Sequence, residues 1–220
     1  MLNFQGAIFD LDGVIVSTDE CHYQAWKYMA NQEGIYFDRK INERLRGVSR
    51  MQSLDIILEK SEKQYTDAEK QELAARKNQQ YVQFVRELRP DAILPGVMEF
   101  LESLREQGLL LAIGSSSKNT RIILEQIGLS DYFDAVADGN AISHSKPDPE
   151  VFLLAAKLLK LKPENCFVVE DADAGVEAAL AGGMKVLAVG SASTNPKATW
   201  HAPSLAGTGI DILMQAGKER

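Results

Sequence analysis

The sequence has few of the features that mark secreted, membrane-bound or nucleic-acid-binding proteins. Its 220 residues include only two cysteines, Cys21 and Cys166, which are too few for a disulfide framework. No apolar run is long enough to span a bilayer, and the N-terminus has no signal-peptide pattern. The net charge of −7 disfavours a general nucleic-acid binder. We therefore expect a cytoplasmic protein that binds neither membranes nor nucleic acids.

The sequence also lacks the common motifs of nucleotide binding and has no cysteine suited to catalysis. The chain has no Gly-x-x-x-x-Gly-Lys-Ser/Thr loop and no Gly-x-Gly-x-x-Gly turn after its first apolar run, which disfavours a nucleotide-binding enzyme. Neither cysteine is expected to be a catalytic thiol, because Cys166 lies in an apolar run and Cys21 has no activating neighbour. In a chain of this charge, an anionic ligand must be held by local cations, a metal ion or backbone N–H groups.

Short apolar runs alternate with helical patterns over most of the chain. The predicted strands are 6–9, 109–114, 135–137, 166–169 and 185–189. The predicted helices between them are 97–107, 119–127, 151–161 and 174–181. This alternation predicts an α/β fold with a doubly wound, Rossmann-like parallel sheet that helices cover on both faces.

Residues 16–91 interrupt the alternation. This region has no convincing strand and is rich in charge and helix formers, as in 43–46, 54–62 and 68–85. Thr66 and Glu69 have the spacing of a capping box at the start of the last of these helices. We therefore predict an all-helical domain, residues 16–91, inserted after the first strand into an α/β core of residues 1–15 and 92–220.

Acidic pairs follow two of the predicted strands. Asp10 and Asp12 come directly after the first strand, and Gly13 allows a sharp turn there. Glu170 and Asp171 follow the strand at 166–169. Ligands bind at the carboxyl ends of parallel strands, so these carboxylates can converge. Carboxylates suit Mg²⁺, and one of them can attack phosphorus to form an acyl phosphate.

The same edge of the sheet is predicted to carry phosphate-binding groups. Ser115 to Ser117 follow the second strand, and the backbone N–H groups of the next helix suit a phosphate. Within this run, Ser116 is expected only to cap the helix. Lys146, in a loop before another helix, supplies a compact positive charge. Such groups provide most of what phosphoryl transfer requires.

These motifs, in this order, resemble the haloacid dehalogenase superfamily of phosphotransferases. The resemblance rests on Asp10-Leu11-Asp12-Gly13-Val14, Ser115, Lys146-Pro147 and Glu170-Asp171. The insertion resembles the α-helical cap of the phosphoglucomutase-type branch. Residues 18–26, 46–50, 76–78 and 117–119 extend the likeness to the β-phosphoglucomutase family. This resemblance implies a Mg²⁺-dependent mutase that interconverts β-glucose 1-phosphate and glucose 6-phosphate through an aspartyl phosphate and β-glucose 1,6-bisphosphate.

The resemblance also implies roles for residues of the core. Asp10 would be the nucleophile and Asp12 the general acid/base. Mg²⁺ would be held by Asp10, the backbone carbonyl of Asp12, Glu170 and Asp171. The remaining residues would hold phosphate: Ser115 and Lys146 the transferring group, and Ser117 and Asn119, together with Arg50, the other one.

Further candidates lie in the insertion. The resemblance implies that His22 and Lys77 couple substrate binding to closure of the cap. Thr18, His22 and Trp26 recur every four residues and share a helix face, so Trp26 also fits a stripe of the insertion's own core. With Gly47, Trp26 completes the set of candidate substrate-binding residues. His144 and His201 have no partner motif and are expected to be loop or surface residues.

Two other functions stay open on the sequence. A sugar-phosphate phosphatase would share the core chemistry, with water in place of the sugar as the second acceptor. A non-enzymatic phospho-acceptor signalling domain also uses acidic residues, a hydroxyl and a lysine on a doubly wound sheet, but it has no need of a cap. We expect a small-molecule sugar phosphate as the ligand and a monomeric protein.

Overall fold

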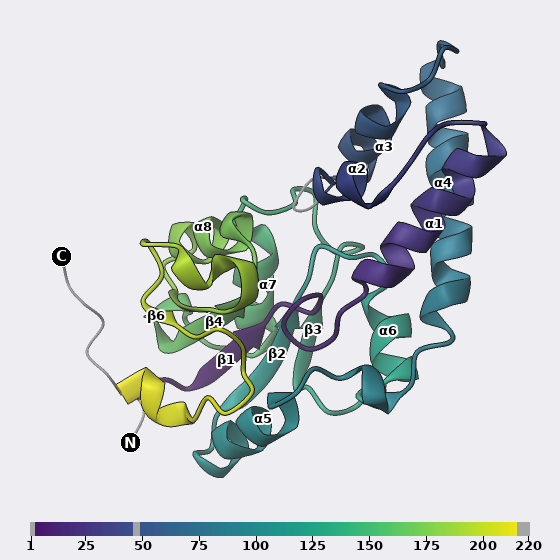
Figure 1. Cartoon of the computed structure of the whole chain (residues 1–220). Helices are drawn as coiled ribbons and strands as arrows, with labels where there is room; N and C mark the ends of the chain where they lie inside the picture. Colours follow the sequence, from purple (N-terminus) through teal and green to yellow (C-terminus); the bar gives the residue numbers. More distant parts are fainter. Residues whose placement is uncertain (1–2, 46–48, 215–220) are drawn as a thin grey trace. The chain divides into compact units, whose positions relative to one another are not determined.

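A computed structural model of the chain describes residues 3–45 and 49–214 (Figure 1). The chain forms two compact units. One contains the chain up to Ser17 and from Arg89 onward, and the other is Thr18–Leu88. The first unit therefore includes Val16, Ser17 and residues 89–91, which the sequence analysis assigns to the insertion. Val16 forms bridges there with Asp12 and Ile93. None of the described helices is long and apolar enough to cross a membrane.

The first unit contains a six-stranded parallel sheet with the order β3-β2-β1-β4-β5-β6, so the predicted α/β doubly wound fold is confirmed. The strands are β1 (Gly6–Phe9), β2 (Leu110–Gly114), β3 (Ala135–Ala137), β4 (Cys166–Glu170), β5 (Lys185–Ala188) and β6 (Trp200–His201). β6 was not predicted, because two residues are too few to show a pattern. The chain order reverses between the central strands β1 and β4, which is where doubly wound sheets bind ligands.

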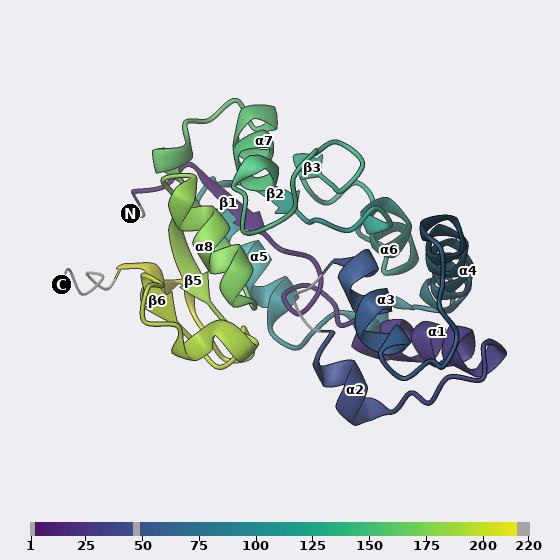
Figure 2. The ribbon, with the colours of Figure 1, turned by 90° about the horizontal axis from the view of Figure 1, so that it is seen from above.

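Helices cover both faces of this sheet (Figure 2). They are α5 (Val97–Glu106), α6 (Thr120–Gln126), α7 (Glu150–Leu158) and α8 (Asp173–Ala181), with short 3₁₀ turns at Pro90–Ala92, Pro163–Asn165, Gly190–Thr194 and Ile210–Met214. Ile8 of β1 packs into a core with α7 and α8. The next residue, Phe9, points to the other face and meets Phe100 of α5.

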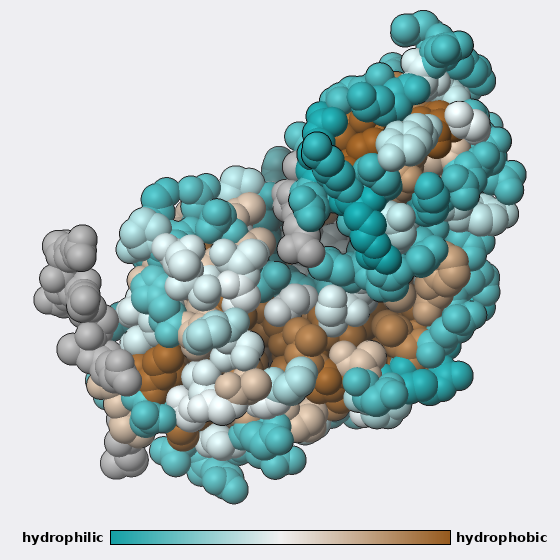
Figure 3. All heavy atoms as spheres, viewed as in Figure 1, coloured by the Kyte–Doolittle hydropathy of each residue, from teal (hydrophilic) through white to brown (hydrophobic). Residues whose placement is uncertain are grey.

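The described part of the second unit is helical. Its helices are α1 (Asp19–Gln32), α2 (Arg39–Glu43), α3 (Arg50–Leu58) and α4 (Asp67–Val85). They enclose a core of their own that includes Trp26, Phe37 and Leu54. On the face seen in Figure 3, hydrophilic side chains surround a smaller hydrophobic area of this unit.

The helix boundaries in this unit follow their caps. The capping box of Thr66 and Glu69 is confirmed at the start of α4. The helix predicted at 43–46 is wrong: α2 begins earlier, because the Asp38 side chain caps it by accepting from the Ile41 N–H. A second capping box at Ser49 starts α3 at Arg50, ahead of the predicted start at residue 54.

Candidate active site

The centre of the site is a buried lysine between two carboxylates. The Nζ atom of Lys146 donates to Oδ1 of Asp10 at 2.6 Å and to Oε2 of Glu170 at 2.7 Å. Asp10 follows β1 and Glu170 ends β4, and the two strands pair in parallel with Phe9 opposite Val169. The exposed fractions of the three side chains are only 11% for Asp10, 10% for Lys146 and 1% for Glu170. The predicted convergence of these three residues is therefore confirmed.

Negative charge exceeds positive charge around this lysine. Burial by itself would lower the pKa of Lys146, but the carboxylates of Asp10 and Glu170 raise it above its ordinary value. Burial raises the pKa of Glu170 in spite of the lysine. Burial and the charges of Asp10, Glu170 and Asp12 raise the pKa of Asp171 to about 8. A proton on Glu170 or Asp171 relieves the repulsion among these carboxylates, and a bound cation would relieve it too.

The acidic residues have a geometry that can hold a metal ion. Carboxylate oxygens of Asp10, Glu170 and Asp171 lie within 4.8 Å of one another. An all-oxygen donor set of this kind fits a hard divalent cation. The backbone turns at Gly13, where φ is +87°, and the Gly13 N–H donates to the carbonyl of Val16 at 2.7 Å. This turn places Asp12, which is half-buried, close enough for its charge to act on Asp171.

The loop after β2 is folded by its own hydroxyl groups. Oγ of Ser115 accepts from the Ser117 N–H, and Oγ of Ser117 accepts from the Asn119 N–H, both at 3.2 Å. Because β2 pairs with β1, Ser115 follows at the same sheet edge as Asp10. The expectation that Ser116 caps α6 is wrong: Asn119 holds the cap position, and Oγ of Ser116 is buried without a hydrogen-bond partner in the described structure.

The candidate residues of the helical unit form a second cluster. Nζ of Lys77 lies 2.8 Å from Nδ1 of His22, and 4.8 Å and 4.6 Å from the ring centres of Trp26 and Tyr81. Lys77 and Trp26 are buried. Burial, followed by the charges of Lys77 and Arg50, lowers the pKa of His22 well below its ordinary value, so this imidazole is neutral at pH 7.

Arg50 lies at the first residue of α3 and is joined to α4. Its Nη2 atom donates to Oδ1 of Asn78 at 2.9 Å, and burial lowers the pKa of the guanidinium. Gly47, the remaining candidate, lies outside the described residues. The sequence pattern did not single out Tyr81, although its spacing of four residues from Lys77 on α4 places both on one helix face.

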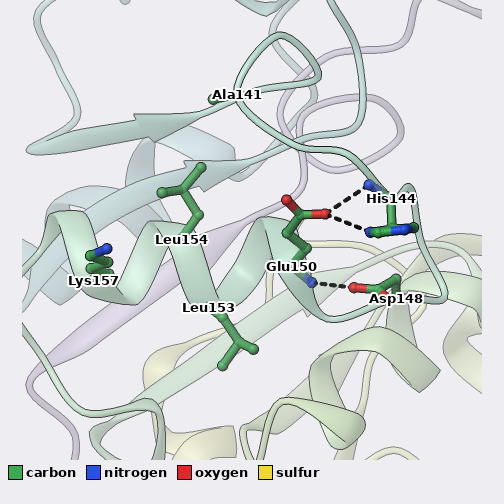
Figure 4. A pocket seen from close by; sticks show the side chains of 7 residues that line it. All are labelled: Ala141, His144, Asp148, Glu150, Leu153, Leu154 and Lys157. Atoms are coloured by element: carbon green, nitrogen blue, oxygen red, sulfur yellow. Dashed lines mark hydrogen bonds and ion pairs between the residues drawn. The ribbon is translucent and has the colours of Figure 1, made fainter.

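A residue missed by the sequence analysis is Glu150, the first residue of α7. Its carboxylate accepts from the backbone N–H groups of Ser143 and His144, which holds its pKa low. Figure 4 shows the contacts of this carboxylate with His144. Asp148 in turn accepts from the Glu150 N–H. The segment that carries Lys146 is thus tied to the start of α7. A surface pocket of about 430 Å³ beside these residues contains none of the predicted site residues.

Comparisons with known proteins agree with this geometry. A family model of haloacid dehalogenase-like hydrolases matches residues 4–183. The β-phosphoglucomutase of Bacillus subtilis is 44% identical over 188 residues, 84% of this chain and 83% of that protein. A fructose-1-phosphate phosphatase of Escherichia coli is 31% identical over 188 residues, 84% of this chain and 96% of that protein. The crystal structure of β-phosphoglucomutase from Clostridium difficile has a TM-score of 0.86 and 38% identity, covering 96% of both chains. The chain is therefore an enzyme that belongs to the haloacid dehalogenase-like hydrolase family.

Proposed function

We propose that the protein is a Mg²⁺-dependent phosphomutase that interconverts β-glucose 1-phosphate and glucose 6-phosphate. The observation that carries the proposal is the buried Asp10 carboxylate, held by Lys146 beside Glu170 and Asp171. The likeness to β-phosphoglucomutases, at 44% and 38% identity, supports the sugar substrate. Residues Thr18–Leu88 would act as a cap that keeps water from the phosphorylated aspartate.

Asp10 is the nucleophile of the proposed reaction. Its carboxylate oxygen attacks phosphorus and forms an acyl phosphate, while the P–O bond to the sugar breaks. Lys146, with the Ser115 hydroxyl and backbone N–H groups of the following loop, would offset the charge on the transferring group. Mg²⁺ held by Asp10, Glu170, Asp171 and the Asp12 carbonyl would add charge neutralisation and orientation.

Asp12 moves the proton in both half-reactions. When phosphoryl leaves Asp10 for the 6-hydroxyl of the sugar, Asp12 accepts the hydroxyl proton. The product of this step is β-glucose 1,6-bisphosphate. When Asp10 then takes the phosphoryl group from the C1 oxygen, Asp12 returns the proton to that oxygen. The net change moves the phosphate from C1 to C6 and restores phosphorylated Asp10.

The helical unit would supply the site for the second phosphate. A bisphosphate needs cations at both ends, and Arg50, oriented by Asn78, is our candidate in this unit. Ser117 and Asn119 would complete this site from the α/β unit. His22 and Lys77 would couple substrate binding to closure of the cap, and Trp26 and Gly47 complete the candidate substrate-binding set.

A sugar-phosphate phosphatase is the second candidate function. The 31% identity to a fructose-1-phosphate phosphatase favours it, and the proposed core chemistry is the same for both. A phospho-acceptor signalling domain finds no support among these relatives, which are enzymes.

One assay separates the two enzymes. Glucose 6-phosphate formed from β-glucose 1-phosphate is measured with Mg²⁺ and catalytic β-glucose 1,6-bisphosphate, and free phosphate is measured in parallel. The mutase is supported by bisphosphate-dependent glucose 6-phosphate with little free phosphate. Free phosphate without isomerisation would replace the mutase with the phosphatase.

A further inference from the structure

We propose that Gly175 is a positioning residue for Glu170: it is glycine because the Glu170 carboxylate occupies the space of a side chain at that position. The inference concerns the acidic cluster that both candidate enzymes would use, and it rests on the proposed role of that cluster as the metal site.

The close approach involves Gly175 near the start of α8. A Cβ atom placed on this residue would overlap the Cδ, Oε2 and Cγ atoms of Glu170. Non-bonded atoms cannot come this close, so one of the two groups must move when position 175 carries a side chain. Gly175 itself is buried within α8, so the helix cannot shift outward without disturbing its own packing.

Glu170 has little freedom to move away. Oε2 accepts from Nζ of Lys146 at 2.7 Å. Oε1 accepts from the backbone N–H groups of Asp171 and Ala172 at 3.1 Å and 3.0 Å. Any shift of the carboxylate therefore breaks hydrogen bonds in a buried site and displaces an oxygen of the acidic cluster.

The backbone of α8 gives no other reason for glycine at this position. Gly175 is helical and does not have a positive φ, and alanine is the better helix former there. Gly13 differs in this respect. A Cβ on Gly13 would overlap Asp171, but its φ of +87° already demands glycine. Gly175 is thus the position where the space for a carboxylate can be tested separately from backbone strain.

The test compares Gly175→Ala with Gly182→Ala in the full-length protein. Gly182 ends the same helix at a φ of −78°, and a Cβ there meets nothing nearer than 3.4 Å. Binding of Mn²⁺, a paramagnetic substitute for Mg²⁺, is measured from the electron paramagnetic resonance signal of the free ion. We expect Gly175→Ala to weaken Mn²⁺ binding about 10–100-fold, as is typical when the support of a metal ligand is lost. We expect Gly182→Ala to bind like the wild type.

Glu170→Ala provides the matched background. Its side chain ends at Cβ, so none of the three atoms that a Cβ at position 175 would overlap remains. Adding Gly175→Ala to Glu170→Ala should therefore weaken Mn²⁺ binding no more than about twofold beyond Glu170→Ala alone. If Gly175→Ala does not fold, recovery of the fold in the double variant, monitored by circular dichroism, supports the same conclusion.

Several results would overturn the inference. One is unchanged Mn²⁺ binding in a folded Gly175→Ala variant. Another is a loss of Mn²⁺ affinity in the double variant that equals the product of the losses in the two single variants. The third is failure to fold of both the Gly175→Ala variant and the double variant. Glu170→Gln distinguishes failure of the inference about Gly175 from failure of the proposed metal site. If Glu170→Gln also binds Mn²⁺ normally, the metal site is wrong and the role of Gly175 is overturned with it.

Discussion

Lys146 is the only cation in contact with the buried carboxylates of Asp10 and Glu170 among the described residues. Removing one member of a buried ion pair lowers the free energy of unfolding by more than the pair contributes to it, because a buried charge is left without a partner. The raised pKa of Glu170 limits that cost, since this group can take up a proton. The stability of the site without metal therefore depends on this lysine.

We expect Lys146→Met to lower the free energy of unfolding by about 3 kcal/mol in the presence of a chelator, because two carboxylates lose their shared partner. Urea unfolding at pH 7.5 measures the loss. Part of the stability should return at lower pH, where Glu170, whose pKa is raised, is protonated. Lys185→Met, an exposed lysine of β5, is the control. A loss equal to that of the control would contradict the buried ion pair.

Asp10→Asn tests the nucleophile. The amide has the shape of the carboxylate and can still accept from Lys146, so we expect an intact fold. It cannot form the acyl phosphate, and turnover should fall more than about 10³-fold. The coupled assay for glucose 6-phosphate measures the rate, and circular dichroism checks the fold. Normal turnover would remove Asp10 from the mechanism.

His22 should make the helical unit sensitive to acid. Its pKa is lowered in the folded protein by burial and by Lys77 and Arg50. Below the unfolded value of about 6.5, only the unfolded chain takes up the proton, so stability falls as the pH falls, by up to about 1.4 kcal/mol per unit. Above about pH 7 the contribution is constant.

His22→Gln keeps a hydrogen-bond acceptor for Lys77 and removes the titration. Urea unfolding between pH 5 and 8, read from Trp26 fluorescence in a Trp200→Phe background, should show a shallower acid loss in this variant. His144→Gln replaces an exposed histidine and serves as the control. Parallel pH profiles for His22→Gln and the wild type would argue against a lowered pKa of His22.

Among helices and strands, the sequence predicted most of what local pattern determines. The apolar runs marked β1, β2, β3, β4 and β5, and the Thr66 capping box marked the start of α4. The error at α2 came from overlooking Asp38, a cap residue that the sequence does display. The convergence of Asp10, Lys146 and Glu170 was predictable because parallel strands end at one edge.

Other features of the site depend on how neighbouring segments of the chain fold against each other. The hydrogen bonds of Glu150 to the backbone of the Lys146 segment, and the space that Gly175 leaves for Glu170, have no signature in the local sequence. A glycine in a helix and a glutamate at a helix start each have ordinary explanations. Only the three-dimensional structure distinguishes these explanations from a role in the site.

The segment before α7 leads to a prediction at Glu150. Glu150→Ala removes the acceptor for the N–H groups of Ser143 and His144. The loop that carries Lys146 then loses these hydrogen bonds to the start of α7. We expect kcat/KM to fall by about 10–100-fold, as small displacements of a positioned group can cause. Glu177→Ala, an exposed glutamate on α8 that pairs with Lys197, is the control. Equal activity of the two variants would show that this tie does not position Lys146.

Considered as a whole, the molecule carries a net charge of −7 and yet is proposed to bind a substrate with two phosphates. Attraction must then come from local groups, among them cationic side chains, a metal ion and backbone N–H groups. Lys146 belongs to the α/β unit, and Arg50 belongs to the helical unit. If each holds one phosphate, only a substrate with two anionic ends needs both units. A small phosphate ester needs the α/β unit alone.

Arg50→Ala separates these two classes of substrate. We expect bisphosphate-dependent formation of glucose 6-phosphate to fall by about 10–100-fold, in line with the loss of a charged hydrogen-bonding group worth about 1.5–3 kcal/mol. Hydrolysis of p-nitrophenyl phosphate should change by less than about twofold, because this ester has no second phosphate. Arg44→Ala is the matched control, since Arg44 lies in the same unit and pairs with Glu59. Equal losses on both substrates would instead place Arg50 outside the site of the second phosphate.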